Sequence, residues 1–129
     1  MNTVSCFHEL LKEILTSHKR AHALIRDGMY AEGYDKLCEI LEVRTSHLPF
    51  CREILIVDIA ATNVEIGNVL QMMSLYGNAA NHFHRAWVHY SSTLGASHAL
   101  TREIELKWVQ AIDHDCKFAV CQRQCASAA

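Results

Sequence analysis

Residues that interrupt helices are scarce in this sequence, which contains one proline and five glycines among 129 residues. So few interruptions favour long helices joined by short turns. A surplus of positive charge is also absent, because 12 lysines and arginines stand against 14 acidic residues and leave a formal net charge of −2. Without that surplus the chain cannot neutralise a row of phosphates, so we expect no nucleic-acid partner.

Long hydrophobic runs are missing as well. The longest, residues 54–57, is far below the roughly 20 residues that a membrane-spanning helix needs. The opening stretch, MNTVSCFHELLKEIL, lacks the basic lead, apolar run and cleavage site of a secretory signal. We therefore expect no membrane partner. The expected location is the cytosol or the nucleus, where the six cysteines would remain reduced.

The composition is that of a folded chain, with 50% hydrophobic and 20% charged residues. Sequences of this kind bury enough apolar surface to outweigh the entropy of ordering the chain. The length suits a single core. We predict one domain over residues 1–125, followed by a frayed tail over residues 126–129.

Apolar residues recur at gaps of three and four along most of the chain, which is the period of an amphipathic helix. The pattern predicts five helices: four over about 3–27, 30–44, 50–73 and 76–92, and a fifth from about residue 97. The β-branched run at 54–57 alone would also suit a strand. Its neighbours continue at helical spacing, so we predict a buried central helix there.

Turn and capping residues separate these segments. Thr3 can cap the first helix, and Gly28 can end it in the left-handed conformation. Pro49 places a loop over residues 44–49 and suits the start of the next helix. Gly95 ends the fourth helix, and Ser97 can cap the fifth.

Small and large residues alternate across the predicted turn between the third and fourth helices. Small side chains let two antiparallel helices approach closely, while large ones fill the gaps beside them. This alternation predicts an all-α fold of antiparallel hairpins. The small residues are Gly67, Ala79 and Ala86, and the large ones are Leu70, Tyr76, Phe83 and Trp87.

On these residues the segments 30–40 and 66–86 resemble the tetratricopeptide repeat. The resemblance implies a short right-handed solenoid whose concave face holds an extended segment of a partner protein. Polar residues of the inner helices line that face in the family, and Asn68 follows Gly67 as asparagine often does there. The peptide-binding residues that the resemblance suggests are Asn63, Asn68 and Arg102.

Residues 34–115 also resemble the C-terminal helical domain of SET-and-MYND lysine methyltransferases. The stretch FHRAWVHYSSTLGASHALTREIE is similar to the last hairpin of that domain, although Ala99 stands where proline is usual. No CxxC pair, glycine-rich cofactor turn or Asn-His-x-Cys element is present. The resemblance therefore implies the helical domain without its enzyme. Its loop is matched by Leu94, Gly95, Ser97, His98 and Thr101.

Two hypotheses for the function follow. The first is a non-catalytic scaffold that binds a protein or peptide, with a homodimer formed through an exposed end of the stack. The alternative is a C-terminal fragment of a SET-and-MYND protein-lysine methyltransferase that shapes the substrate cleft. We expect no enzymatic activity from this chain alone.

Histidines and cysteines offer candidate metal ligands. His18 and His22 lie four residues apart and can share a metal, but the sequence does not name a third ligand. The other cluster matches no known zinc module in its spacing, so a zinc-stabilised module is only a third hypothesis and we expect no metal and no cofactor. That cluster consists of His114, Cys116, Cys121 and Cys125.

A polar stripe on the fourth helix contains His82 and His89, which lie seven residues apart and share a face. The simplest interpretation is the solvent side of an amphipathic helix. The alternative is a partner surface that responds to pH.

Overall fold

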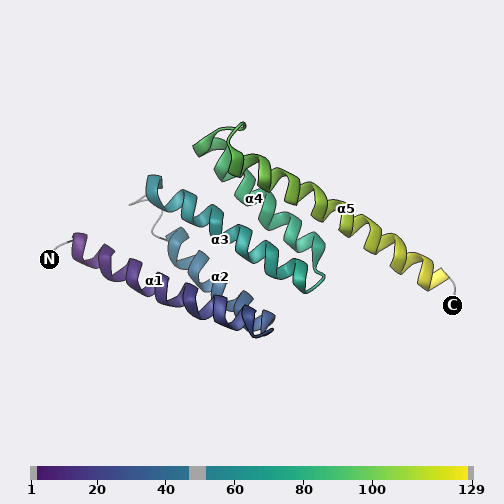
Figure 1. The fold of residues 1–129 in the computed structure, drawn as a ribbon, viewed down its shortest axis with the longest axis horizontal. Coiled ribbons are helices and arrows are strands. Elements are labelled where there is room, and N and C mark those ends of the chain that lie inside the picture. The colour runs from purple at the N-terminus through teal and green to yellow at the C-terminus, as the bar shows by residue number, and fades with distance from the viewer. Residues whose placement is uncertain (1–2, 47–51, 128–129) are drawn as a thin grey trace.

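The computed structural model describes residues 3–46 and 52–127, with side chains described for residues 9, 10, 12–46 and 56–117. All regular structure in these ranges is α-helical, which confirms the all-α prediction and the number of helices (Figure 1). The five helices are α1 (Thr3–Arg26), α2 (Tyr30–Ser46), α3 (Arg52–Met72), α4 (Tyr76–Leu94) and α5 (Ala99–Ser127).

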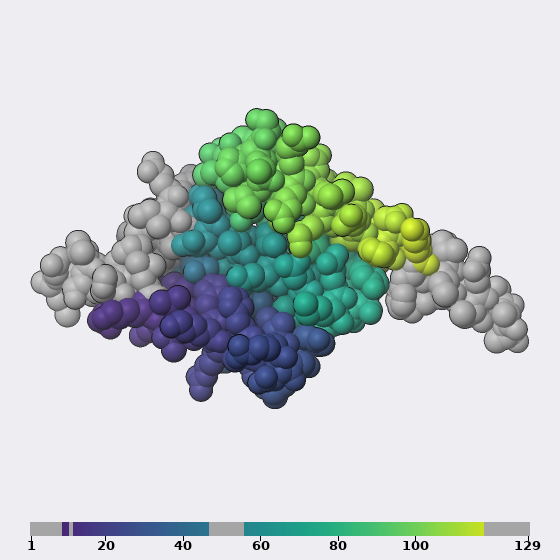
Figure 2. All heavy atoms as spheres, viewed as in Figure 1, coloured from purple at the N-terminus to yellow at the C-terminus, as the bar shows by residue number. Residues whose placement is uncertain are grey.

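Each helix packs mainly against the helices that precede and follow it in the chain. Figure 2 shows the consequence: the atoms of α3 form a central band between α1 and α2 on one side and α4 and α5 on the other. Side-chain contacts also join α1 to α3 and α3 to α5. The helix α3 therefore lies next to both α1 and α5.

The predicted helices agree with the observed ones to within about two residues where they can be compared. Residues 54–57 lie inside α3, so the strand alternative is wrong. Residues 44–46 of the predicted loop are instead the last turn of α2, so this part of the prediction is wrong. The predicted cap by the Thr3 side chain, the rest of that loop and residues 128–129 of the predicted tail lie outside the described part of the structure. Among the described residues, no helix is both long and apolar enough to cross a membrane.

The start of α5 differs from the prediction. His98, not Ser97, precedes the first helical residue, and its Nδ1 accepts a hydrogen bond from the backbone N–H of Leu100 at 3.2 Å. The ring of His98 therefore caps α5 in place of the predicted Ser97 hydroxyl, since both groups can accept a hydrogen bond from an unpaired N–H of the first turn.

The core lies at the crossing of α3 and α4. Phe83 is fully buried, and so are Ala79 and Ala86, as the alternation of small and large residues predicts. The ring of Phe83 occupies the space beside Gly67: a Cβ added to this glycine would lie 2.6 Å from the ring. Only a residue without a side chain allows α3 and α4 to come this close.

Two helices end in the same kind of turn. Gly28 follows α1 with φ of +81°, and the N–H of Met29 reaches back to the carbonyl of Leu24 at 2.9 Å, as in a Schellman motif. After α3 the equivalent residue is Ser74, with φ of +61°, and the N–H of Leu75 bonds the carbonyl of Leu70 at 2.8 Å. A serine here carries strain that glycine avoids.

Replacement of Gly67 by alanine should destabilise the fold. The new methyl group would overlap the Phe83 ring, which is buried and has no space to move. We expect the free energy of unfolding in urea to fall by about 1–3 kcal/mol through overpacking, which exceeds the gain of about 1 kcal/mol in helix propensity.

Gly77→Ala is the matched control, because the atoms nearest its added Cβ would be those of the Asp115 carboxylate, at 3.3 Å, at the end of an exposed side chain. It should leave stability unchanged or raise it slightly. The cost of Gly67→Ala should be smaller when Phe83 is already replaced by leucine, because the smaller side chain leaves space for the new methyl group. This cost is the difference in stability between Gly67→Ala/Phe83→Leu and Phe83→Leu. Equal stability of Gly67→Ala and the wild type would show that α3 and α4 are not in close contact.

Ser74→Gly should stabilise the protein. Glycine adopts the left-handed conformation without the steric cost that serine bears, although it also gives the unfolded chain more freedom. We expect a net rise of about 0.5–1 kcal/mol in the free energy of unfolding. The reverse change, Gly28→Ser, should lower it by a similar amount. A loss of stability in Ser74→Gly would contradict the turn geometry.

Candidate functional site

A groove of about 590 Å³ lies between the C-terminal part of α3 and the middle of α5, with the first residue of α4 at one end. Its lining combines amide groups, one ammonium, one imidazole, a thioether and a phenol. The lining residues are Asn68, Gln71 and Met72 from α3, Tyr76 from α4, and Lys107, Gln110 and His114 from α5.

Lys107 and Asn68 connect the two walls of the groove. The Nζ of Lys107 donates a hydrogen bond to Oδ1 of Asn68 at 3.1 Å. The same ammonium lies 5.9 Å from the centre of the Phe83 ring, within the range of a cation–π interaction. These two contacts hold a positive charge at the groove, where it can meet an anionic group of a ligand.

Two stacked rings line the end of the groove away from Lys107 and Asn68. Tyr76 and His114 have ring centroids 5.2 Å apart and planes inclined by 26°. Met72 is exposed beside them. The groove thus has an amide and ammonium end and a more apolar end, which suits an extended peptide with mixed side chains.

The three residues predicted to bind a peptide lie in different places. Asn68 lines the groove, and Arg102 is exposed near the start of α5 but is not among the lining residues. Asn63 is buried, with 2% exposed area. Its Nδ2 donates to the carbonyl of Ile59 at 3.1 Å, and its Oδ1 lies 2.9 Å from Nδ1 of His82. The peptide-binding role of the three residues stays a prediction.

The sequence reasoning did not select Lys107. This lysine is 39 positions from its partner Asn68, and the period of α5 alone does not show which residue of α3 it faces. The half-buried state of Lys107 next to the half-buried Trp108 follows from the angle at which α5 crosses α3 and α4, which packing determines.

The predicted metal cluster is only partly described. His114 and Cys116 are exposed on α5, and Cys116 is a free thiol. The side chains of Cys121 and Cys125 lie outside the described residues. Within the described part of the chain, the one group of three close donors suited to a metal consists of His18, His22 and Glu65.

No family model, curated protein or solved structure matches this chain. The resemblances to the tetratricopeptide repeat and to the SET-and-MYND domain therefore stay hypotheses.

The burial and the pKa of His82 bear on the alternative of a pH-sensitive surface on α4. Burial, together with the nearby charge of Arg85, lowers the pKa of His82 from 6.5 to about 4. Since Oδ1 of Asn63 can only accept, Nδ1 of His82 carries the proton in this hydrogen bond. His82 is thus neutral at pH 7 and contributes to the packing of α4 against α3. Burial also lowers the pKa of His89.

Acidification should lower the stability of the fold through His82. Above pH 6.5 His82 is neutral in both the folded and unfolded states, so its contribution does not vary. Between pH 6.5 and about 4 the unfolded chain binds a proton that the folded chain refuses, so stability falls as the pH falls. Below about pH 4 both states are protonated and the contribution levels off.

Urea unfolding of the wild type and of His82→Gln at pH 7.5, 5.5 and 4.5 should show this difference. The variant should lose less stability over this range. The slopes of the unfolding free energy against pH should differ by at most the uptake of about one proton. His84→Gln, which changes an exposed histidine of the same helix, is the control and should follow the wild type. Identical slopes for the wild type and His82→Gln would contradict the buried, neutral state.

Proposed function

We propose that this chain is a non-catalytic, tetratricopeptide-like scaffold that binds an extended segment of a partner protein in the groove between α3 and α5. The observation that carries the proposal is the Lys107 ammonium, held by Asn68 and the Phe83 ring at a groove of about 590 Å³. A fixed cation beside amide groups is suited to a carboxylate and the peptide bonds next to it.

The lining residues divide the work of recognition. The amides of Asn68, Gln71 and Gln110 can donate to and accept from a peptide backbone. Met72 and Tyr76 provide the apolar surface for a neighbouring side chain, and methionine adapts to different shapes. The preferred ligand is therefore an acidic segment or a chain end with a free carboxylate, followed or preceded by an apolar residue.

The arrangement of the helices supports a solenoid. Direct side-chain contacts place α1, α3 and α5 next to one another, while each is also packed against the helix that follows or precedes it. In a tetratricopeptide-like stack, the first helices of successive hairpins line the concave face in this way. Because the scaffold forms the groove by itself, a ligand would pay little reordering cost.

An exposed apolar face on α5 supports the expected homodimer. Leu106, Val109 and Ile112 have 59%, 54% and 42% exposed area. A second copy or a further helix would cover such a face. The alternative function, a fragment of a lysine methyltransferase, has only the sequence resemblance in its favour.

Selection of peptides from a random library displayed on phage tests the proposal. The purified chain should enrich peptides with an acidic residue or a free carboxyl end, and Lys107→Gln should weaken their binding by about tenfold or more, the effect of one charge-assisted hydrogen bond. Asn68→Ala should weaken it less, because it removes an uncharged hydrogen-bonding group and leaves the ammonium of Lys107 in the groove. Fluorescence anisotropy of a labelled peptide measures both.

Lys36→Gln is the matched control. Lys36 lies on α2, pairs with Glu39 and does not line the groove, so this variant should bind like the wild type. Arg102→Ala tests whether the site extends towards the start of α5. A library without any enriched motif, or equal binding by Lys107→Gln and the wild type, would reject the groove as the binding site.

A further inference from the structure

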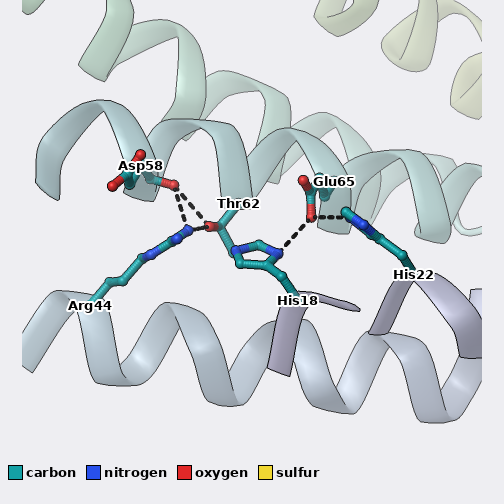
Figure 3. Close-up of polar contacts among 6 residues, drawn as sticks. All are labelled: His18, His22, Arg44, Asp58, Thr62 and Glu65. Carbon is teal, nitrogen blue, oxygen red and sulfur yellow. Dashed lines mark hydrogen bonds and ion pairs between the residues drawn. The ribbon is translucent and has the colours of Figure 1, made fainter. Parts of the chain in front are cut away.

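Three metal-binding side chains from two helices meet on the side of α3 that faces α1 (Figure 3). His18 and His22 lie one turn apart on α1, and Glu65 of α3 points between them. One carboxylate oxygen, Oε2, lies 3.4 Å from Nδ1 of His18 and 3.2 Å from Nε2 of His22. All three donor atoms lie within 4.8 Å of one another. Glu65 thus lies where a third donor beside the two histidines would be needed.

These separations suit a tetrahedral metal. With bonds of about 2.1 Å, two ligands of a tetrahedral zinc ion lie about 3.4 Å apart. The two distances to the Glu65 oxygen already have this length. The centroids of the two imidazole rings lie 5.7 Å apart, with planes inclined by 48°. Rotation of these rings about their side-chain bonds would direct both nitrogens to one point.

The surroundings leave the carboxylate available to its two histidines. The nearby cation, Arg44, donates instead to the carbonyl of Asp58 at 3.2 Å and to the hydroxyl of Thr62 (Figure 3). Burial raises the pKa of Glu65, but the hydrogen bonds and charges of His18 and His22 outweigh it and lower the pKa.

We propose that His18, His22 and Glu65 bind a zinc ion that links α1 to α3. Two imidazoles and one carboxylate form a donor set typical of zinc, whereas calcium and magnesium prefer six or more oxygen ligands. Water occupies the fourth position, because His22 has 58% side-chain exposure and opens the site to solvent.

The zinc ion has a structural consequence. It joins two helices that are separated in the chain by α2, so the first hairpin becomes fixed to the central helix. Any binding to the folded state alone stabilises that state. The site joins α3 to α1 through Glu65, whereas the proposed peptide groove lies between α3 and α5, so the two proposals rest on different contacts.

A plain ion pair is the competing explanation. Protonated histidines beside a carboxylate would show the same distances. The two explanations predict different responses to metal. If the contact is an ion pair, zinc should not stabilise the protein; if it is a metal site, zinc should stabilise the protein and magnesium should not.

Thermal unfolding of the full chain tests the site. After treatment with EDTA and its removal, zinc chloride in hundredfold excess over its Kd should raise Tm by at least about 5 °C. Magnesium chloride at the same concentration should leave Tm unchanged. Zinc affinity by calorimetry should fall by more than about tenfold in His22→Gln and in Glu65→Gln, since even outer-shell changes at metal sites cost that much.

His98→Asn is the matched control: it removes an exposed histidine at the start of α5, and asparagine can keep the cap. It should keep the full response to zinc, and so should Lys107→Gln in the groove. The melting temperature of each variant without metal shows that it is folded.

Cysteines are the other possible zinc ligands, and cobalt distinguishes them. The cobalt complex of the wild type should lack the charge-transfer absorption of a thiolate ligand, because the proposed donors are nitrogen and oxygen. An unchanged Tm with zinc, a thiolate signal, or a full zinc response in both His22→Gln and Glu65→Gln would overturn the proposal.

Discussion

The close approach of α3 and α4 at Gly67 and Phe83 is the constraint on which the rest of the structure depends. The ring leaves no space for even one methyl group on the glycine, so the two helices can pack in this register only. A sliding of one turn would bring a side chain against the ring. The hydrogen bond between Asn63 and His82 fixes the same pair of helices one turn earlier. Polar and apolar contacts thus agree on one alignment.

The functional residues are grouped around the same glycine. Glu65 lies two positions before Gly67 and faces α1, while Asn68 follows it and faces α5. The helix α3 thus offers a ligand to each neighbouring odd-numbered helix within a single turn. The hairpins are held by buried apolar contacts, whereas the contacts named between α1, α3 and α5 are polar and partly exposed. Such contacts contribute less to stability and are more accessible to metals and peptides.

Much of this fold could be predicted from residues that are neighbours in the sequence. The period of the apolar residues predicts the helices, and Gly28 predicts the end of α1. The alternation of small and large residues from Gly67 to Ala86 predicts the packing of α3 on α4. The left-handed conformation of Ser74 is not predicted by the sequence, because serine rarely adopts it. These features depend on local chemistry, which sequence patterns report well.

The candidate sites were harder to predict because they join distant parts of the chain. Glu65 is 43 residues from His22, and Lys107 is 39 from Asn68. Their meeting depends on the angle and register of packed helices, which the period of one helix does not contain. Asn63 shows the reverse error: an asparagine expected on a surface is buried, because its amide satisfies partners on its own helix and on α4.

The helix α5 continues past the other helices to Ser127 (Figure 1), beyond His114, which stacks on Tyr76, and Asp115, which lies next to Gly77. A separate peptide of this length would rarely be helical, since the first turn is costly to form. Here the docked turns up to Asp115 supply that nucleus, so the turns that follow need only propagation. Local pairs such as the 2.9 Å contact between Asp113 and Lys117 support the helix where it leaves α4. The helical state of the last turns thus depends on the docked part of the same helix and not on a core of their own.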